Sequence, residues 1–173
     1  MADGWTRMSK QLYTLEFPVR CSPSILYEFL STPAGLGEWF AEKVDERDGI
    51  FYFGWNGAFE KADVLESEHE KYIKFHWLTA PKEEFFEFRI EKSEITNQTI
   101  LVIKDFAEKK EIKDQSMLWD YQVKELFHRL GNWERINVEG RIEQKNRWTR
   151  NVDLRSRVAI NGTIQFSEFP LNR

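Results

Sequence analysis

Cysteine is scarce in this 173-residue chain, which has only Cys21. A single thiol excludes an internal disulfide and fits a reducing, cytoplasmic location. No apolar run approaches the roughly 20 residues that a membrane-spanning helix needs, and residues 1–10 have no apolar stretch of the secretory-signal type. No candidate base accompanies Cys21, so we expect a small, buried or half-buried residue just before a helix rather than a nucleophile.

Motifs for metal, phosphate or nucleophilic chemistry are also missing. There is no Gly-rich phosphate loop, no HExxH, no CxxC and no GxSxG elbow. The histidines, His69, His76 and His128, do not have the spacing of metal ligands, and we expect all three at the surface. The sequence therefore predicts no metal and no cofactor.

Acidic residues give no convincing catalytic pair. Glu84 and Glu87 are three apart in an expected strand, so their side chains should point to opposite faces. Asp105 ends an expected strand, and we predict that it caps the following turn rather than acting in catalysis.

The charge is uneven along the chain. The net charge is −4, and residues 132–173 contribute +3 through eight basic and five acidic side chains, so residues 1–131 carry −7. Phosphate contacts need a clustered positive face. The acidic main part therefore argues against nucleic-acid binding there.

Aromatic residues are what the chain has in excess, at 15% with 7 Trp and 14 Phe. Many of them alternate with polar residues, which is typical of half-buried antiparallel strands. The expected strands are 13–19, 50–55, 58–65, 71–78, 84–90 and 99–105. Asn56-Gly57 lies between two of these strands and is a strong hairpin signal.

Two short helices are predicted after the first strand. Ser22 can cap the first helix and Pro23 suits its first turn. Residues 31–35 are expected to break this helix, and Leu36–Phe40 to form the second one.

A long helix is predicted near the end, over Gln115–Leu130. Its apolar residues are spaced 4, 3 and 4 apart and so share one face; they are Trp119, Val123, Leu126 and Leu130. The expected fold class is α+β of the helix-grip type. In that fold a curved antiparallel sheet wraps around a long C-terminal helix, with two short helices after the first strand.

Several segments resemble START-like domains of the SRPBCC superfamily, close to small bacterial members and to the group related to the activator of the ninety-kilodalton heat-shock ATPase. The segments are Ser22–Ala41, Phe75–Leu78, Glu84–Ile90, Asp105–Ala107, Met117–Trp119 and Leu126–Gly131. The resemblance covers about residues 8–131. It implies hydrophobic-ligand binding, polyketide cyclisation, lipid transfer or chaperone docking, and the fold alone does not choose among them.

The resemblance implies three parts of the chain. Residues 1–7 are expected to be an N-terminal extension, 8–131 the START-like domain, and 132–173 a flexible or loosely docked extension. Within the last part, 157–160 and 163–166 flank Asn161-Gly162 and suggest a hairpin. The alternatives are a stably added hairpin and a non-native read-through sequence.

Ten side chains are candidates for lining a pocket under the long helix, because small-molecule sites are mostly apolar with a few polar groups. They are Trp39, Phe40, Phe53, Trp55, Phe75, Trp77, Phe86, Phe88, Trp119 and Val123. The indole N–H groups of Trp55, Trp77 and Trp119 are candidates for orienting a ligand, and Gly35 and Gly37 for letting the segment 33–40 act as a gate. The opposing interpretation is that the rings interdigitate and fill the space.

The leading functional hypothesis is a non-enzymatic domain that binds a small hydrophobic or amphipathic ligand. A protein-interaction or co-chaperone-like module with a filled core is the alternative. A cyclase- or hydrolase-like enzyme is the third hypothesis, and it needs a buried titratable group with a shifted pKa. The sequence offers no convincing candidate for such a group.

Overall fold

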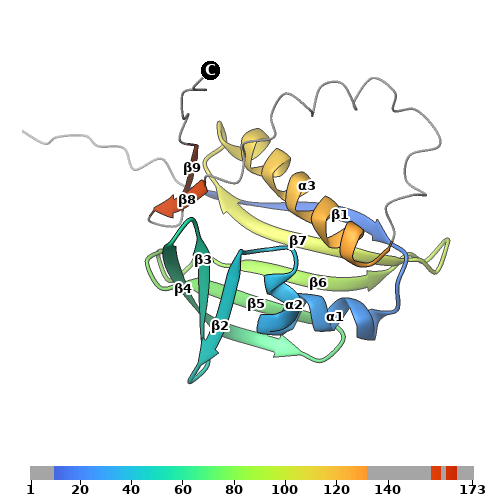
Figure 1. Cartoon of the computed structure of the whole chain (residues 1–173). Coiled ribbons are helices and arrows are strands. Elements are labelled where there is room, and N and C mark those ends of the chain that lie inside the picture. Colours follow the sequence, from blue (N-terminus) through green and yellow to red (C-terminus); the bar gives the residue numbers. More distant parts are fainter. Residues whose placement is uncertain (1–9, 132–156, 161–162, 167–173) are drawn as a thin grey trace, which may run out of the picture.

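Seven antiparallel strands form one curved sheet in the computed structural model, which describes residues 10–131, 157–160 and 163–166 (Figure 1). The order across the sheet is β1-β7-β6-β5-β4-β3-β2. The strands are β1 (Gln11–Val19), β2 (Lys43–Arg47), β3 (Ile50–Trp55), β4 (Ala58–Glu68), β5 (Tyr72–Trp77), β6 (Phe86–Lys92) and β7 (Thr99–Ala107). Strands β2 to β7 follow one another as a meander, and β1 pairs with β7. The predicted fold class, α+β with a helix-grip layout, is confirmed.

Two hairpins in the meander use the same turn chemistry. Asn56 and Gly57 join β3 to β4 with φ values of 49° and 81°, as the sequence predicts. Asp48 and Gly49 join β2 to β3 with φ values of 53° and 78°. Strand β2 was not predicted, although Asp-Gly carries the same signal as Asn-Gly. Its residues are mostly charged and exposed, as is typical of an edge strand.

The helices α1 (Pro23–Ser31) and α2 (Pro33–Gly37) are separated by one residue, Thr32. Ser22 caps α1 by accepting a hydrogen bond from the backbone N–H of Ile25 (3.3 Å), which confirms the predicted start. Thr32 caps α2 by accepting one from Gly35 (3.0 Å). The prediction of a second helix over 36–40 was therefore wrong, because the cap at Thr32 and the proline after it start the helix earlier.

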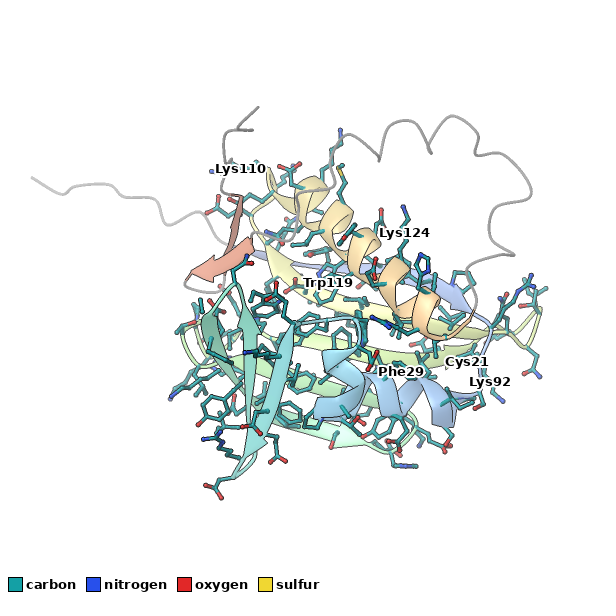
Figure 2. All side chains as sticks on the ribbon, in the orientation of Figure 1. Cys21, Phe29, Lys92, Lys110, Trp119 and Lys124 are labelled. Carbon is teal, nitrogen blue, oxygen red and sulfur yellow. The ribbon has the colours of Figure 1, made fainter. Side chains whose placement is uncertain are left out.

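The helix α3 (Ile112–Arg129) lies with α1 and α2 on the same face of the sheet (Figure 1). Trp119, Val123 and Leu126 are buried and Leu130 is half-buried, so the predicted apolar face is confirmed. In Figure 2, Trp119 lies between the helix and the sheet, and Lys124 lies on the far side of the helix. The helix begins three residues before the predicted start.

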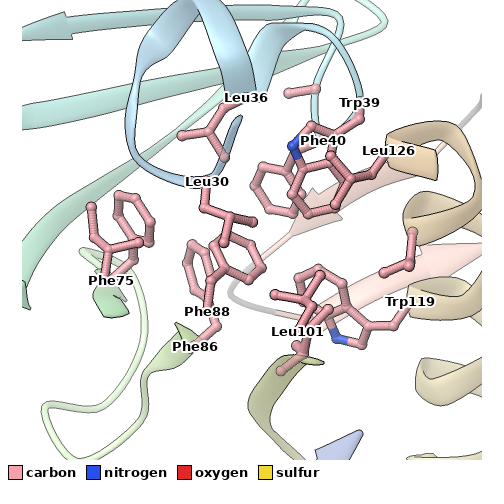
Figure 3. Close-up of a cluster of buried hydrophobic side chains, with 14 of the residues drawn as sticks. Leu30, Leu36, Trp39, Phe40, Phe75, Phe86, Phe88, Leu101, Trp119 and Leu126 are labelled. Atoms are coloured by element: carbon pink, nitrogen blue, oxygen red, sulfur yellow. The ribbon is translucent and has the colours of Figure 1, made fainter. Parts of the chain in front are cut away.

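Aromatic rings fill the space between the sheet and the helices (Figure 3). Phe53, Phe75 and Phe88 are fully buried. Phe40, from the segment that follows α2, places its ring 5.1 Å from Phe53 and 5.7 Å from Trp119, measured between centroids. The Phe40 ring therefore packs both against the sheet and against α3.

On the other face of the sheet, Glu87 is buried beneath three cationic side chains. Its carboxylate lies 2.7 Å from Arg89, 3.3 Å from Lys104 and 3.5 Å from Lys74. Burial opposes ionisation of Glu87, but the ion pairs with Arg89 and Lys104 outweigh it and hold the pKa below its ordinary value. Glu84 precedes β6 and pairs with Lys10 (2.7 Å), so the expectation that both acids lie in one strand was wrong.

His76 corrects another expectation, since it is buried rather than on the surface. Its Nδ1 lies 2.8 Å from the carbonyl oxygen of Glu84. A carbonyl only accepts hydrogen bonds, so Nδ1 carries the proton and donates it. His69 and His128 are exposed, as predicted.

Strands β8 (Arg157–Ile160) and β9 (Thr163–Phe166) pair antiparallel in a separate two-stranded sheet, over the residues suggested for a hairpin. The rest of the expected C-terminal extension and the expected N-terminal extension, 1–7, lie outside the described residues. The domain boundaries therefore stay predictions. In the described part of the chain, no helix is long and apolar enough to cross a membrane.

Gly35 and Gly37 provide a matched test of how α2 packs on α1. A Cβ atom at Gly35 would lie 2.2 Å from the carbonyl oxygen of Glu28, whereas one at Gly37 would meet nothing nearer than 4.0 Å. We expect Gly35→Ala to lower the free energy of unfolding by about 2 kcal/mol or more. Gly37→Ala should leave it unchanged or raise it by up to about 1 kcal/mol. Urea unfolding of both variants measures this, and equal effects would contradict the close approach.

Candidate ligand-binding pocket

A pocket of about 320 Å³ opens between α3, the segment 37–42 after α2, and the ends of the central strands. Its walls combine aromatic rings with acidic and amide side chains. The lining residues are Lys10, Gly37, Glu38, Trp39, Phe40, Ala41, Glu42, Trp55, Glu60, Trp77, Phe86, Asp105, Phe106, Ala107, Glu111, Gln115, Leu118, Trp119, Tyr121, Gln122, Glu125 and Arg129.

The ten predicted lining residues divide into two groups. Six of them line the pocket, and these are Trp39, Phe40, Trp55, Trp77, Phe86 and Trp119. The other four, Phe53, Phe75, Phe88 and Val123, are buried in the packed core and do not line it. The pocket therefore lies beside a solid aromatic core, toward one end of the sheet.

The carbonyl group of Phe40 holds one wall of the pocket together. It accepts hydrogen bonds from Nε1 of Trp55 on β3 (3.2 Å) and from Nε2 of Gln122 on α3 (3.3 Å). The Phe40 ring is stacked on that of Trp119, with only 8° between the ring planes. One residue thus ties the segment 37–42 to both the sheet and the long helix.

Asp105 is an inward-facing carboxyl group of β7 with three donors around it. Its Oδ2 accepts hydrogen bonds from Nε1 of Trp119 (3.0 Å) and from the hydroxyl of Tyr13 (3.2 Å). Its Oδ1 accepts one from the backbone N–H of Phe106 (2.7 Å). The predicted role as a cap of the following turn was wrong, because Asp105 lies within the strand and joins β1, β7 and α3.

The surroundings of Asp105 raise its pKa to about 6. Burial is the main cause, because it disfavours the charged form, and the three hydrogen bonds and the charge of Lys10 only partly oppose it. Burial and the neighbouring Asp105 also raise the pKa of Tyr13. Asp105 is therefore poised to change its protonation state near neutral pH.

Glu60 is a second inward-facing carboxyl group, on β4 opposite Phe53 of β3. Burial raises its pKa to about 7. Its Oε2 atom is shielded from solvent and has no hydrogen-bond partner among the described residues. Glu60 was not among the predicted site residues, and no titratable group with a shifted pKa was expected. The pocket has two such groups, Glu60 and Asp105.

The signal for Glu60 was present in the strand alternation. Ala62 is fully buried, so residues two positions away from it along β4 face the same way. Glu60 shares this inward side, and Phe59 is exposed on the other. An acidic residue at an inward position is the feature that marks a polar group in an apolar site.

Two other expectations about this region stay predictions. The indole N–H groups of Trp55 and Trp119 are engaged by Phe40 and Asp105, which leaves only Trp77 of the three without a hydrogen bond within residues 10–131. The missing side chain of Gly35 lets α2 contact the backbone of α1, which explains this glycine by packing, and the gating role expected of Gly35 and Gly37 stays a prediction.

Neither the cysteine nor a metal cluster adds reactive chemistry to the described residues. Cys21 is half-buried, and burial raises the pKa of its thiol to about 11, which disfavours the nucleophilic thiolate. In residues 10–131, no three His, Cys, Asp or Glu side chains are grouped in a way that holds a metal ion. The reactive groups of the pocket are thus its carboxyl groups.

The fold agrees with the outcome of a comparison with family models. The model of the START-like superfamily domain matches residues 7–132. The chain belongs to the START-like superfamily. No curated protein matches it.

Solved structures share this START-like fold at low sequence identity. The Aha1 dimer from Colwellia psychrerythraea is 17% identical with a TM-score of 0.55, over 67% of this chain and 92% of that one. Protein MLL2253 from Mesorhizobium loti is 18% identical with a TM-score of 0.58, over 70% and 97%. DynU16, from the dynemicin biosynthetic locus, is 17% identical with a TM-score of 0.59, over 69% and 47%. These likenesses concern the fold alone.

Glu60 predicts an unusual pH dependence of stability. Its folded pKa of about 7 lies above the ordinary value of 4.5, so in this window the folded state holds a proton that the unfolded chain has lost. The stability contribution of Glu60 is therefore lost as pH rises from about 4.5 to about 7. We expect Glu60→Gln to be more stable than the wild type at about pH 8 and to lose this advantage at about pH 4.

The measurement is the urea midpoint of both proteins across this pH range. Glu16→Gln, an identical change at an exposed position of β1, is the control and should show no such trend. Parallel pH profiles for wild type and Glu60→Gln would contradict the raised pKa.

The hydrogen bond from Trp119 to Asp105 predicts a change in a single titration. Trp119→Phe removes a donor that favours the charged carboxylate, so the pKa of Asp105 should rise further above about 6. Carbon NMR of the labelled carboxyl group of Asp105 measures this pKa. Trp39→Phe is the matched control, because the Trp39 indole donates to the carbonyl oxygen of Phe29 (2.9 Å) instead. An unchanged pKa in Trp119→Phe would exclude the proposed coupling.

Proposed function

We propose that this START-like domain binds a small amphipathic molecule in the pocket under α3. The observation that carries the proposal is the joining, in one pocket of about 320 Å³, of eight aromatic side chains from the sheet, α3 and the segment after α2 with two carboxyl groups of raised pKa. Apolar walls with a few convergent polar groups are the usual form of a small-molecule site.

The volume favours a compact ligand over a long lipid chain. Ligand pockets span roughly 300–1,000 Å³, and this one is near the lower end. The fully buried rings of Phe53, Phe75 and Phe88 occupy the space deeper under the helices. A ligand with one or two rings and a polar end therefore suits the pocket, and burial of its apolar surface at about 25 cal/mol per Å² would supply most of the affinity.

The mechanism is sequestration in the cytoplasm, the compartment that the single, high-pKa thiol fits. The ligand enters between α3 and the segment 37–42. The Phe40 carbonyl group holds this segment in place, with hydrogen bonds to Trp55 and Gln122, so the walls are formed before the ligand arrives. Preorganisation of this kind lowers the ordering cost of binding.

The protein-interaction alternative has less support. The core is filled, as this alternative assumes, but a pocket opens beside it. The exposed large apolar side chains come from β1, α1, β4, α3 and two turns; they are Leu12, Ile25, Phe59, Leu65, Leu78, Ile95 and Met117. The similarity to Aha1 concerns the fold and brings no partner to this chain.

One observation supports the hypothesis that the domain is an enzyme. Asp105 and Glu60 have pKa values near neutrality, and general acids and bases work best in that range. No activated nucleophile accompanies them among the described residues, since the Cys21 thiol is held protonated. A cyclase-like reaction by proton transfer is thus the second candidate, and it differs from binding in releasing an altered ligand.

Native mass spectrometry of freshly purified protein tests the proposal, with a denatured sample as reference. We expect a small molecule that is lost on denaturation. Incubation with that molecule should return it unchanged if the domain only binds, and altered if it is an enzyme. A protein that carries no molecule and binds no aromatic probe would overturn the proposal.

Tryptophan signals locate the binding. Four of the seven Trp residues line the pocket, and the other three lie outside the described residues. A neutral probe, naphthylethanol, should shift the indole N–H signals of Trp39, Trp55, Trp77 and Trp119 in nitrogen–proton correlation spectra. Signals that stay in place would contradict binding at this site.

Blocking the pocket gives a matched pair of variants on α3. Gln115 lines the pocket, whereas Lys113 is exposed outside it. We expect Gln115→Trp to weaken naphthylethanol binding at least about tenfold by filling the entrance, a loss of about 1.4 kcal/mol. Lys113→Trp should bind as the wild type does. Equal affinities for both variants would contradict the position of the entrance.

A further inference from the structure

Two oxygen atoms on side chains that line the pocket lack the hydrogen bonds that buried polar atoms normally have. They are Oε2 of Glu60 and Oε1 of Gln122, both shielded from solvent and both without a partner among the described residues. Leaving such a group unsatisfied costs about 1–3 kcal/mol, so native proteins keep few of them. Two in one pocket indicate that its occupant brings the missing donors.

Rotation of the Gln122 amide does not remove the problem. Its Nε2 donates to the carbonyl oxygen of Phe40 at 3.3 Å. Exchanging the two amide atoms would place Oε1 against that carbonyl oxygen, where two acceptors cannot bond. The hydrogen bond to Phe40 therefore fixes the orientation of the Gln122 amide and leaves Oε1 as the atom without a partner.

The two remaining orphan oxygens of the described part are at different places. Oε2 of Glu108 lies 3.1 Å from Nζ of Lys110 and is paired with that charge. Oδ1 of Asp63 belongs to a residue that does not line the pocket. The unmet demand for donors at the pocket thus comes from Glu60 and Gln122.

The charged side chains around the pocket also favour an occupant that brings donors and positive charge. Six lining residues are acidic, namely Glu38, Glu42, Glu60, Asp105, Glu111 and Glu125, against two basic ones. Both basic side chains are already engaged, Lys10 by Glu84 at 2.7 Å and Arg129 by Glu38 at 3.4 Å. The carboxyl groups are therefore in excess over the cations that the chain supplies.

Aromatic faces complete the pattern. The rings of Trp55, Trp77 and Phe86 line the pocket and contact one another, with centroids 6.3 Å and 4.8 Å apart. A cation above such a face is attracted by the negative π-cloud, and Trp is the strongest partner. Carboxyl groups and indole rings together favour a cationic occupant.

We propose that the ligand carries a primary or secondary ammonium group on a compact apolar body, and that Glu60 and Gln122 accept its N–H donors. This proposal rests on the proposed function, since it names the chemical class of the ligand in the same pocket. A primary or secondary ammonium group provides two or three donors, so it can serve more than one acceptor. It also supplies the positive charge that Glu60 lacks.

The ionisation of Glu60 supports this assignment. Burial raises the pKa of Glu60 to about 7, and no cationic side chain of the described residues compensates for the lost water. A bound ammonium group favours the carboxylate and restores a charged pair. By contrast, an anionic ligand would meet the repulsion of Glu60 and its acidic neighbours.

Three probes with one ring system separate the ligand classes. They are naphthylethylamine, which is cationic, naphthylethanol, which is neutral, and naphthylacetate, which is anionic. We expect calorimetric titration of the full chain at about pH 8 to give tightest binding for the amine, about tenfold tighter than the alcohol. The acid should bind more weakly than the alcohol.

Glu60→Gln provides the decisive variant, since it removes the charge and keeps the shape. The preference for the amine over the alcohol should fall from about tenfold to about twofold or less. The readout is the ratio of the affinity for the amine to the affinity for the alcohol, so a general change in binding does not affect it. Glu16→Gln, the same change at an exposed position of β1, is the control and should keep the full preference.

The outcomes distinguish the ammonium assignment from the proposal that the pocket binds a ligand. Binding of the alcohol without preference for the amine overturns the ammonium assignment and leaves the binding function standing. A preference for the amine that survives in Glu60→Gln overturns the role of Glu60. Failure of all three probes to bind overturns both the ammonium assignment and the pocket as a site for compact aromatic ligands.

Discussion

The hydrogen bond from Trp119 to Asp105 joins the long helix to the sheet, and the pocket depends on it. Asp105 also accepts a hydrogen bond from Tyr13, so one carboxyl group holds β1, β7 and α3 together. The stacked rings of Phe40 and Trp119 extend this junction to the segment after α2. Without the junction, α3 would keep its hydrogen bonds to the segment after α2, such as that from Gln122 to Phe40, but would lose its direct hydrogen bond to the sheet.

The two faces of the sheet treat carboxyl groups in opposite ways. On the outer face, Arg89 and Lys104 surround Glu87 and hold its pKa below the ordinary value despite its burial. On the inner face, no cationic side chain of the described residues pairs with Glu60. Asp105 accepts hydrogen bonds from groups that carry no positive charge. Burial therefore raises the pKa of both carboxyl groups. The ion pairs of Glu87 join neighbouring strands, whereas Glu60 and Asp105 are carboxyl groups that can still interact with a ligand.

Much of the architecture could be predicted from residue patterns, because those patterns follow local rules. The spacing of Trp119, Val123 and Leu126 places α3 over the sheet, and Asn56-Gly57 places a hairpin. Strand β2 escaped prediction because its charged residues lack the apolar alternation of a half-buried strand. The register with β3 makes it a strand, and register is a property of two segments rather than one.

The site was harder to predict than the fold, for a physical reason. The sequence shows which rings point inward, but which of them fill the core depends on how their volumes interlock: Phe53 and Phe75 are fully buried, while Trp55 and Trp77, farther along the same strands, line the pocket. Glu60 faces inward only because β4 pairs with β3 in the register that sets it opposite Phe53. A shift of one residue would expose Glu60 and bury Phe59.

Comparing Glu60 with Phe59 at the inward position shows how the pocket lowers the stability of the fold. With Phe59 inside, the sheet would gain an apolar contact and lose an uncompensated acid, and the pocket would be smaller and without its carboxylate. The same shift would turn the fully buried Ala62 outward and a charged neighbour inward, which opposes it. The packed rings of Phe53, Phe75 and Phe88 stabilise the domain enough for Glu60 and Gln122 to keep acceptors without partners. The stable core and the polar pocket are therefore two ends of one sheet, and the first makes the second possible.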